Sequence, residues 1–199
     1  MRARPPPTPR KRETMPHPNL LHIDRAALVV IDIQEAFRDV IPDFDGFVSR
    51  VATAIAGFQT LGVPVIVTEQ YPKGLGTTVG ELRAVLRAER PPFEKTAFSS
   101  CGASSFVEAV ANSGRSQIVL CGVEAHVCVN QTAHDLIDRG YQVHVLADCV
   151  SSRYDYNRLA GLAKMARAGV IESSVEMALF EMMRDAKYEN FKEIQALIR

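Results

Sequence analysis

The chain has 199 residues, 47% of them hydrophobic, which is enough for one globular domain with a sizeable core. Its formal net charge is zero, but residues 1–14 carry five Lys or Arg and one Glu, so the other 185 residues, with 18 basic and 22 acidic side chains, carry a net charge of −4. An acidic body argues against a nucleic-acid-binding surface, and no apolar run is long enough to cross a membrane.

Residues 1–19 combine six prolines with basic residues and almost nothing apolar, which predicts a disordered tail ahead of one domain at residues 20–199. A basic arm that contacts nucleic acid or a membrane is an alternative for this tail, and Met15 is an alternative start of the chain. No apolar stretch follows the basic residues, so the tail does not resemble a signal peptide.

The four cysteines form no C-x-x-C pair, so neither a zinc knuckle nor a thioredoxin motif is present. They are Cys101, Cys121, Cys128 and Cys149. The histidines lack metal-ligand spacing, so we expect neither a metal nor a cofactor. The simplest interpretation is a cytoplasmic protein whose thiols are free.

From residue 20 onward, apolar runs typical of strands alternate with helical patterns. The strand-like runs are residues 26–31, 63–67, 117–121 and 142–147, with a short last run that begins at residue 169. Helical patterns cover residues 47–58, 105–111 (with a capping box of Ser105 and Glu108), 129–137, 159–166, about 174–185 and about 189–198. Strands that are apolar without alternation fit a parallel sheet buried on both faces, in an open, doubly wound α/β domain.

Ligands of such domains bind beyond the carboxyl ends of the strands. Polar or nucleophilic residues follow four of the expected strands: Asp32, residues 68–71, residues 122–128, and the pair Asp148 and Cys149. Within residues 68–71, Glu69, Gln70 and Tyr71 are candidate substrate contacts. The glycine-rich stretch 74–80 lacks both nucleotide-binding signatures, so we expect a mobile loop over the pocket.

Two charged residues are candidates for catalysis. Asp32 has apolar residues on both sides, and partial burial would raise its pKa and suit it to proton transfer. Lys95 lies between Phe93 and Phe98, where a cation could stabilise a thiolate or an oxyanion. The alternatives are an N-cap for Asp32 and a surface charge on a short edge strand for Lys95.

Cys128 lies six residues after Gly122, where an apolar run meets a helical pattern. Unpaired N–H groups and a helix dipole there would favour the thiolate and lower the pKa of Cys128. A buried core thiol is the alternative. Cys101 and Cys149 are predicted loop thiols and further candidates, and a dyad with His126 is a second choice, since residues two apart on a helix face different ways.

Three motifs in order resemble the isochorismatase-like cysteine hydrolases, a superfamily that includes nicotinamidases and N-carbamoyl-amide hydrolases. They are Val-Val-Ile-Asp-Ile-Gln at 29–34, Glu-Lys-Thr-Ala-Phe-Ser at 94–99 and Gly-Val-Glu-Ala-His-Val-Cys-Val at 122–129. The likeness runs from about residue 24 to residue 198. Residues 67–72, 74–76 and 191–195 are similar to those of isochorismatase domain-containing proteins.

The resemblance implies a three-layer fold with a six-stranded, mostly parallel sheet and a catalytic triad of Asp32, Lys95 and Cys128. It also implies a cis peptide bond between Val123 and Glu124, which would aim the N–H groups of Glu124 and Cys128 into one oxyanion hole. A homo-oligomer, either a dimer or a higher even assembly, is expected from the same likeness. The apolar residues among 177–183 support it, unless they belong to the core.

We therefore expect a hydrolase that attacks a small amide or related carbonyl compound through an acyl-enzyme on Cys128. Nicotinamidases carry metal-binding histidines just after the second strand, whereas residues 69–74 of this chain hold no histidine, which argues against nicotinamidase activity. True isochorismatases use no cysteine at the position of Cys128, which argues against vinyl-ether hydrolysis. The rival interpretations are a non-catalytic member that binds a small molecule or a protein, an isochorismatase-type vinyl-ether hydrolase, and a redox-sensing thiol.

Overall fold

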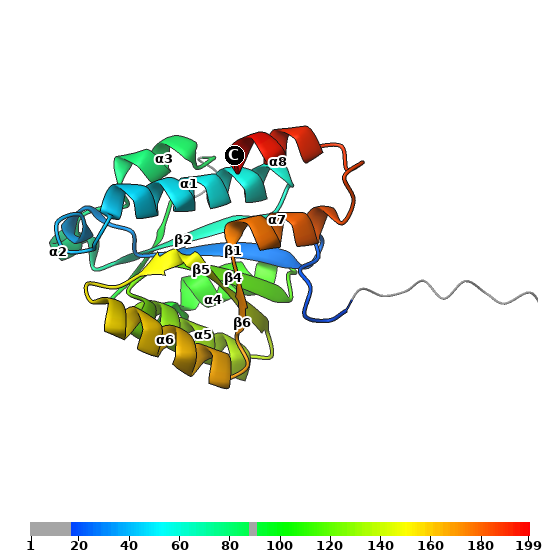
Figure 1. Cartoon of the computed structure of the whole chain (residues 1–199). Helices are drawn as coiled ribbons and strands as arrows, with labels where there is room; N and C mark the ends of the chain where they lie inside the picture. Colours follow the sequence, from blue (N-terminus) through cyan, green and yellow to red (C-terminus); the bar gives the residue numbers. More distant parts are fainter. Residues whose placement is uncertain (1–16, 88–90) are drawn as a thin grey trace, which may run out of the picture.

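The computed structural model of the protein describes residues 17–87 and 91–199. One sheet of six parallel strands has the order β3-β2-β1-β4-β5-β6 (Figure 1). The strands are β1 (Ala26–Ile31), β2 (Val65–Gln70), β3 (Phe93–Lys95), β4 (Gln117–Val123), β5 (Gln142–Ser151) and β6 (Ile171–Ser173). The expected doubly wound fold is confirmed. All of the predicted tail except residues 17–19 lies outside the described residues.

Helices cover both faces of the sheet and complete three layers (Figure 1). One face carries α1 (Phe44–Thr60), α3 (Gly80–Val85), α7 (Val175–Met183) and α8 (Phe191–Leu197). The other carries α4 (Ser104–Asn112), α5 (Asn130–Asp138) and α6 (Asp155–Arg167). Shorter elements are α2 (Pro72–Leu75), the 3-10 helices η1 (Glu35–Phe37) and η2 (Ser100–Gly102), and the π-helical turn η3 (Ala125–Val129).

Strand β1 shows how a continuous apolar run builds this fold. All of its six side chains are buried. Ala26, Leu28 and Val30 belong to the core on the α1 side of the sheet, and the three residues that alternate with them belong to the core on the α5 side. Because side chains alternate across a strand, one run supplies two cores only if both of its faces are covered.

Some predicted boundaries are wrong. β5 continues three residues past Asp148, so Cys149 is a fully buried strand residue and not a loop thiol. α4 begins one residue before Ser105, and its N-cap makes no side-chain hydrogen bond. Ser105 is therefore inside the first turn, where it cannot form the expected capping box with Glu108.

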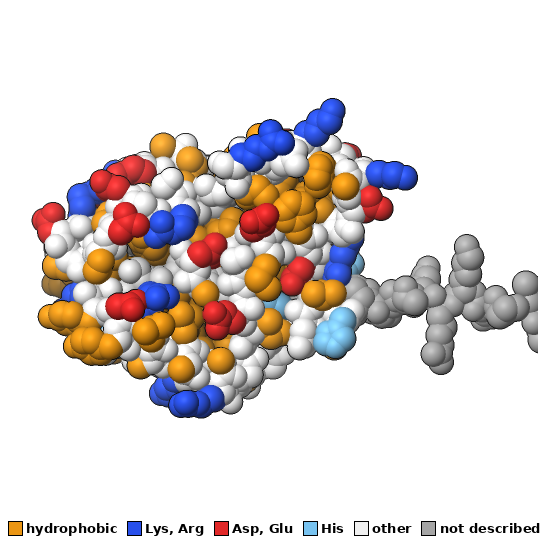
Figure 2. Space-filling model, in the orientation of Figure 1, with side chains coloured by type: hydrophobic (Ala, Val, Ile, Leu, Met, Phe, Trp, Pro, Cys, Tyr) orange, Lys and Arg blue, Asp and Glu red, His pale blue; other side chains and the backbone are white. Residues whose placement is uncertain are grey.

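The apolar residues of α7 divide between core and surface. Leu179, Met182 and Met183 are buried in the core on the α1 side. Met177 and Phe180 are 51% and 37% exposed, in a region where apolar side chains gather around α7 and α8 (Figure 2). Core packing thus accounts for three of these five residues, and the homo-oligomer stays a prediction. In the described ranges, no helix has the length and apolarity needed to cross a bilayer.

Candidate active site

Three segments bring Asp32, Lys95 and Cys128 to the carboxyl edge of the sheet. Asp32 follows β1, Lys95 is the last residue of β3, and Cys128 lies in η3, just after β4. The strand order reverses at β1, and ligands of open α/β sheets bind at such a switch point. The three residues are only 0%, 5% and 7% exposed, so their charges and protons interact at low dielectric.

The backbone and Thr68 together aim the carboxylate of Asp32. Asp32 has a left-handed conformation with φ 56°, a region that Asp adopts more readily than most residues. Its N–H donates to the carbonyl oxygen of Thr68 at 3.2 Å, and the Thr68 hydroxyl donates to Oδ1 of Asp32 at 2.8 Å. Strand β2 therefore holds one carboxylate oxygen and leaves the other free for a second partner.

That second partner is Lys95, whose Nζ donates to Oδ2 of Asp32 at 2.6 Å. The same Nζ lies 2.7 Å from Oε1 of Gln70 and 2.9 and 3.2 Å from the carbonyl oxygens of Phe98 and Ala97. Four acceptors therefore surround a group with three protons to donate. A buried ion pair persists only when such additional hydrogen bonds compensate for lost hydration.

Burial sets the proton affinities of both reactive groups. It raises the pKa of Asp32 above its ordinary value, although Lys95, Thr68 and the Cys128 thiol lower it. Burial, followed by the charge of Asp32, raises the pKa of Cys128 to about 12, against smaller lowering contributions from Lys95 and the N–H of Glu124. Asp32 and Cys128 thus each affect the proton affinity of the other. The thiol thus rests protonated beside a base of increased strength.

The predicted lowering of the Cys128 pKa is therefore wrong for this resting site. Cys128 lies in a five-residue π-helical turn ahead of α5, and not in the first turn of a regular helix. The nearby ammonium of Lys95 is already paired with Asp32. Burial of the sulfur therefore raises the thiol pKa by more than Lys95 and the backbone N–H of Glu124 lower it.

The loop between β4 and η3 is fixed by packing and by a buried carboxylate. The peptide bond between Val123 and Glu124 is cis. Gly122 has φ 125°, and a Cβ there would collide with the carbonyl oxygen of Ile31, so only glycine fits. The Glu124 carboxylate, 7% exposed, accepts from the backbone N–H of Arg153 at 2.8 Å and from its Nε at 3.1 Å. These contacts hold the loop against the segment after β5.

The three candidate substrate contacts occupy different surroundings. Oε1 of Glu69 accepts from the N–H and the hydroxyl of Thr78 at 2.6 and 2.7 Å, and Glu69 is only 6% exposed. The amide oxygen of Gln70 accepts from Lys95. Tyr71 is 54% exposed and follows directly. Of the three, Tyr71 alone presents most of its surface to solvent.

Side chains of the sheet edge hold the middle of the glycine-rich stretch, at Gly76 and Thr78. The amide nitrogen of Gln34 donates to the carbonyl oxygens of Gln70 and Gly76 at 3.0 and 2.6 Å, and its oxygen accepts from the N–H of Gln70 at 2.8 Å. Thr78, two residues after Gly76, is held by Glu69. These bonds argue against the expected mobile loop.

The other candidate residues lie in different environments. Nδ1 of His126 is 3.1 Å from the hydroxyl of Ser152. Cys101 lies in η2 at 9% exposure, while Cys121 and Cys149 are fully buried in strands, where burial raises the pKa of each thiol. Within residues 17–87 and 91–199, no three His, Cys, Asp or Glu side chains converge as metal ligands do.

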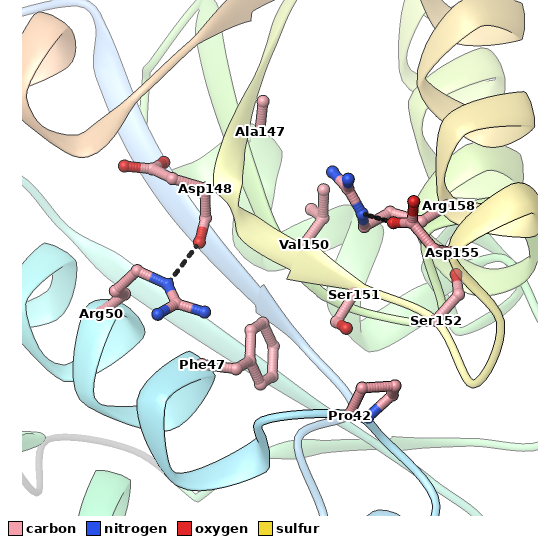
Figure 3. Close-up of a pocket in the computed structure, with 10 residues that line it drawn as sticks. All are labelled: Pro42, Phe47, Arg50, Ala147, Asp148, Val150, Ser151, Ser152, Asp155 and Arg158. Atoms are coloured by element: carbon pink, nitrogen blue, oxygen red, sulfur yellow. Dashed lines mark hydrogen bonds and ion pairs between the residues drawn. The ribbon is translucent and has the colours of Figure 1, made fainter.

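A separate depression of about 310 Å³ opens between α1, β5 and α6 (Figure 3). Its lining comprises Pro42, Phe47, Arg50, Ala147, Asp148, Val150, Ser151, Ser152, Asp155 and Arg158. Nε of Arg50 donates to the carbonyl oxygen of Asp148 at 3.1 Å, as the figure shows. Because none of Asp32, Lys95 and Cys128 lines it, we place the candidate chemistry at those three residues and not in this hollow.

A doubly wound parallel sheet with buried polar groups at its carboxyl edge defines a three-layer α/β protein of the Rossmann-like class. Comparison with known proteins then identifies the family. The model of the isochorismatase domain matches residues 26–177, so the chain belongs to the isochorismatase family, with its isochorismatase-like hydrolase fold.

Individual relatives agree with this assignment. Isochorismatase domain-containing protein 2 of Danio rerio is 42% identical over 173 residues, which cover 87% of this chain and 86% of the relative. The MAR1 ribonuclease of Caenorhabditis elegans is 38% identical with a TM-score of 0.85, covering 90% of this chain and 92% of the other. YcaC of Pseudomonas aeruginosa, solved with hexane-2,5-diol and covalent acrylamide, is 25% identical with a TM-score of 0.82, covering 89% and 91%.

Proposed function

We propose that this protein is a cysteine-dependent hydrolase that cleaves a small amide or related carbonyl compound through an acyl-enzyme on Cys128. The observation that carries the proposal is the buried Asp32–Lys95 ion pair together with the buried thiol of Cys128, whose pKa responds to the charges of both. A base, a cation and a nucleophile held together from three separate segments are the parts that acyl transfer needs. Membership of the isochorismatase family supports a hydrolase.

In the first half of the reaction, Asp32 accepts the proton of the Cys128 thiol while the sulfur attacks the carbonyl carbon. A carbon–sulfur bond forms, and the carbonyl electrons move to oxygen. The backbone N–H groups of Glu124 and Cys128 stabilise that oxyanion. The carbon–nitrogen bond then breaks, and Asp32 returns its proton to the leaving amine.

In the second half, Asp32 accepts a proton from water, whose oxygen attacks the thioester carbon. The carbon–sulfur bond breaks, the acid is released, and the proton on Asp32 returns to the sulfur of Cys128. Lys95 keeps the carboxylate of Asp32 ionised between proton transfers and opposes the charge that develops on sulfur. The protein ends each cycle with the thiol protonated, as the raised pKa of Cys128 requires.

A direct test combines acylation and turnover. Wild type, Cys128→Ala and the matched control Cys101→Ala are treated with 4-nitrophenyl acetate and with a panel of small primary amides that includes acrylamide, a covalent ligand in the YcaC structure. We expect an acetyl group on Cys128, ammonia release from at least one amide, and the loss of both only in Cys128→Ala. Turnover that survives in Cys128→Ala contradicts the proposal.

Cleavage of RNA is a second candidate, because a structure 38% identical to this chain is that of a ribonuclease. The same three variants are incubated with a fluorescent single-stranded RNA oligonucleotide. RNA cleavage that disappears in Cys128→Ala and survives in Cys101→Ala would support this second activity. Cleavage that is equal in all variants comes from elsewhere and does not.

A further inference from the structure

The side chain of Gln70 touches the ion pair of the candidate site from the neighbouring strand. Gln70 and Lys95 are register partners in the parallel pair of β2 and β3, so their side chains lie side by side on one face of the sheet. The 2.7 Å contact from Nζ of Lys95 to Oε1 of Gln70 is nearly as short as its 2.6 Å contact to Asp32. Two acceptors, one charged and one neutral, therefore compete for the same ammonium.

The direction of the Gln70 amide is fixed by a second contact. Its Nε2 donates to the carbonyl oxygen of Thr96 at 2.7 Å. The opposite orientation would place the NH₂ group against the ammonium of Lys95 and the amide oxygen against a carbonyl oxygen, so both contacts would be repulsive. The amide therefore presents its oxygen to Lys95 in one orientation only.

The main chain of Gln70 is fixed as well. The buried side chain of Gln34 accepts from the N–H of Gln70 at 2.8 Å and donates to its carbonyl oxygen at 3.0 Å. Gln34 lies two residues after Asp32, so this clamp ties Gln70 to the segment that carries the carboxylate. The amide oxygen of Gln70 is thereby set relative to both members of the ion pair.

We infer that Gln70 is a positioning residue, whose amide oxygen holds the ammonium of Lys95 at the place where it serves both Asp32 and Cys128. This inference rests on the proposed function and changes the role of Gln70 from substrate contact to support of the lysine. The other charged groups nearby are Glu69 and Glu94, which alternation places on the opposite face of β2 and β3.

The test measures alkylation of Cys128 by iodoacetamide, mapped by mass spectrometry, between about pH 6 and about pH 10.5. It needs no substrate. Gln70→Leu removes the acceptor without adding charge, and Gln70→Glu adds a charge that competes with Asp32 for Lys95. The matched control is Gln142→Glu. It is the same change at the first residue of β5, at the amino end of the strands and away from the candidate site.

We expect Gln70→Glu to slow alkylation at a given pH by about ten-fold, because an added negative charge opposes the thiolate. Gln70→Leu should slow it by a smaller factor, because a loosely held ammonium supports the thiolate less, and Gln142→Glu should match wild type. The inference is overturned if Gln70→Leu matches wild type, or if Gln70→Glu matches Gln142→Glu. Failure of the proposed function looks different, because turnover would then survive in Cys128→Ala, whatever the alkylation rates of the Gln70 variants.

Discussion

Replacing Asp32 with Asn should make Cys128 more reactive and the enzyme less active. In the wild type, burial and the charge of Asp32 raise the pKa of Cys128 to about 12. At pH 8, about one thiol in ten thousand is then ionised, compared with about a quarter of an ordinary thiol of pKa about 8.5. Wild-type Cys128 should alkylate slowly at neutral pH, and its rate should continue to rise beyond pH 9, where an ordinary thiol levels off.

Asp32→Asn removes both contributions by which the carboxylate raises the thiol pKa, and it leaves the ammonium of Lys95 without its counter-charge. Two unit charges about 4 Å apart at an effective dielectric constant of about 20 interact by about 4 kcal/mol, or about three pKa units. Because burial of the sulfur remains, we expect the thiol pKa to fall by about two units and alkylation at pH 8 to accelerate by about 100-fold. Hydrolysis should fall instead, because the proton acceptor is lost.

The assay is the pH profile of iodoacetamide labelling at Cys128, with the same thiol in urea-unfolded protein as the reference for an ordinary cysteine. Asp148→Asn is the matched control, since Asp148 lies near the same edge of the sheet but accepts from the N–H of Val175. A slower or unchanged profile in Asp32→Asn refutes the electrostatic reasoning. So does wild-type labelling that levels off near pH 9.

Three further predictions concern stability and are measured by urea unfolding. Both ring nitrogens of fully buried His144 lack partners in the described structure, and burial lowers its pKa from 6.5 to about 4. Between these two values the unfolded state binds a proton that the folded state does not, so His144 should lower the stability by about 1.4 kcal/mol per pH unit as the pH falls, a contribution that His144→Leu removes. Gly122→Ala should cost about 3 kcal/mol or more, because the new Cβ meets backbone, whereas Gly114→Ala, with open space around it, should cost about 1 kcal/mol; equal costs would contradict the steric argument. Thr78→Val should cost about 1–3 kcal/mol by leaving Glu69 short of a donor, and Thr78→Ser should restore most of that loss.

The fold was largely predictable because its signal is local. The apolar run that becomes β1 has no polar interruption, and a parallel sheet is the structure that buries such a run on both faces. The ends of the strands were less predictable. Strand β5 continues beyond Asp148 because it pairs with β4, and the register of that pairing shifts between Leu120 and Gly122. Pairing partners, and not the residues of β5 themselves, decide where that strand ends.

The members of the candidate site were predictable, but their proton affinities were not. Asp32, Lys95 and Cys128 meet at one edge because of strand polarity, which the order of motifs reveals. The thiol pKa depends on how deeply distant segments bury the sulfur, which no local pattern records. Gln34 and Arg153 were missed as supports; for Gln34 a signal existed, a polar residue in an apolar stretch two positions after Asp32.

The ion pair at the candidate site depends on the weakest part of the sheet. β3 is a three-residue edge strand, joined to the rest by three register pairs with β2, whereas Asp32 and Cys128 follow strands at the centre. Edge segments open locally at a lower free energy than the core. Local opening of β3 would withdraw Lys95 and leave the carboxylate and the thiol in a folded protein. We therefore expect the proposed hydrolysis to be lost at a lower temperature or denaturant concentration than the one that unfolds the chain.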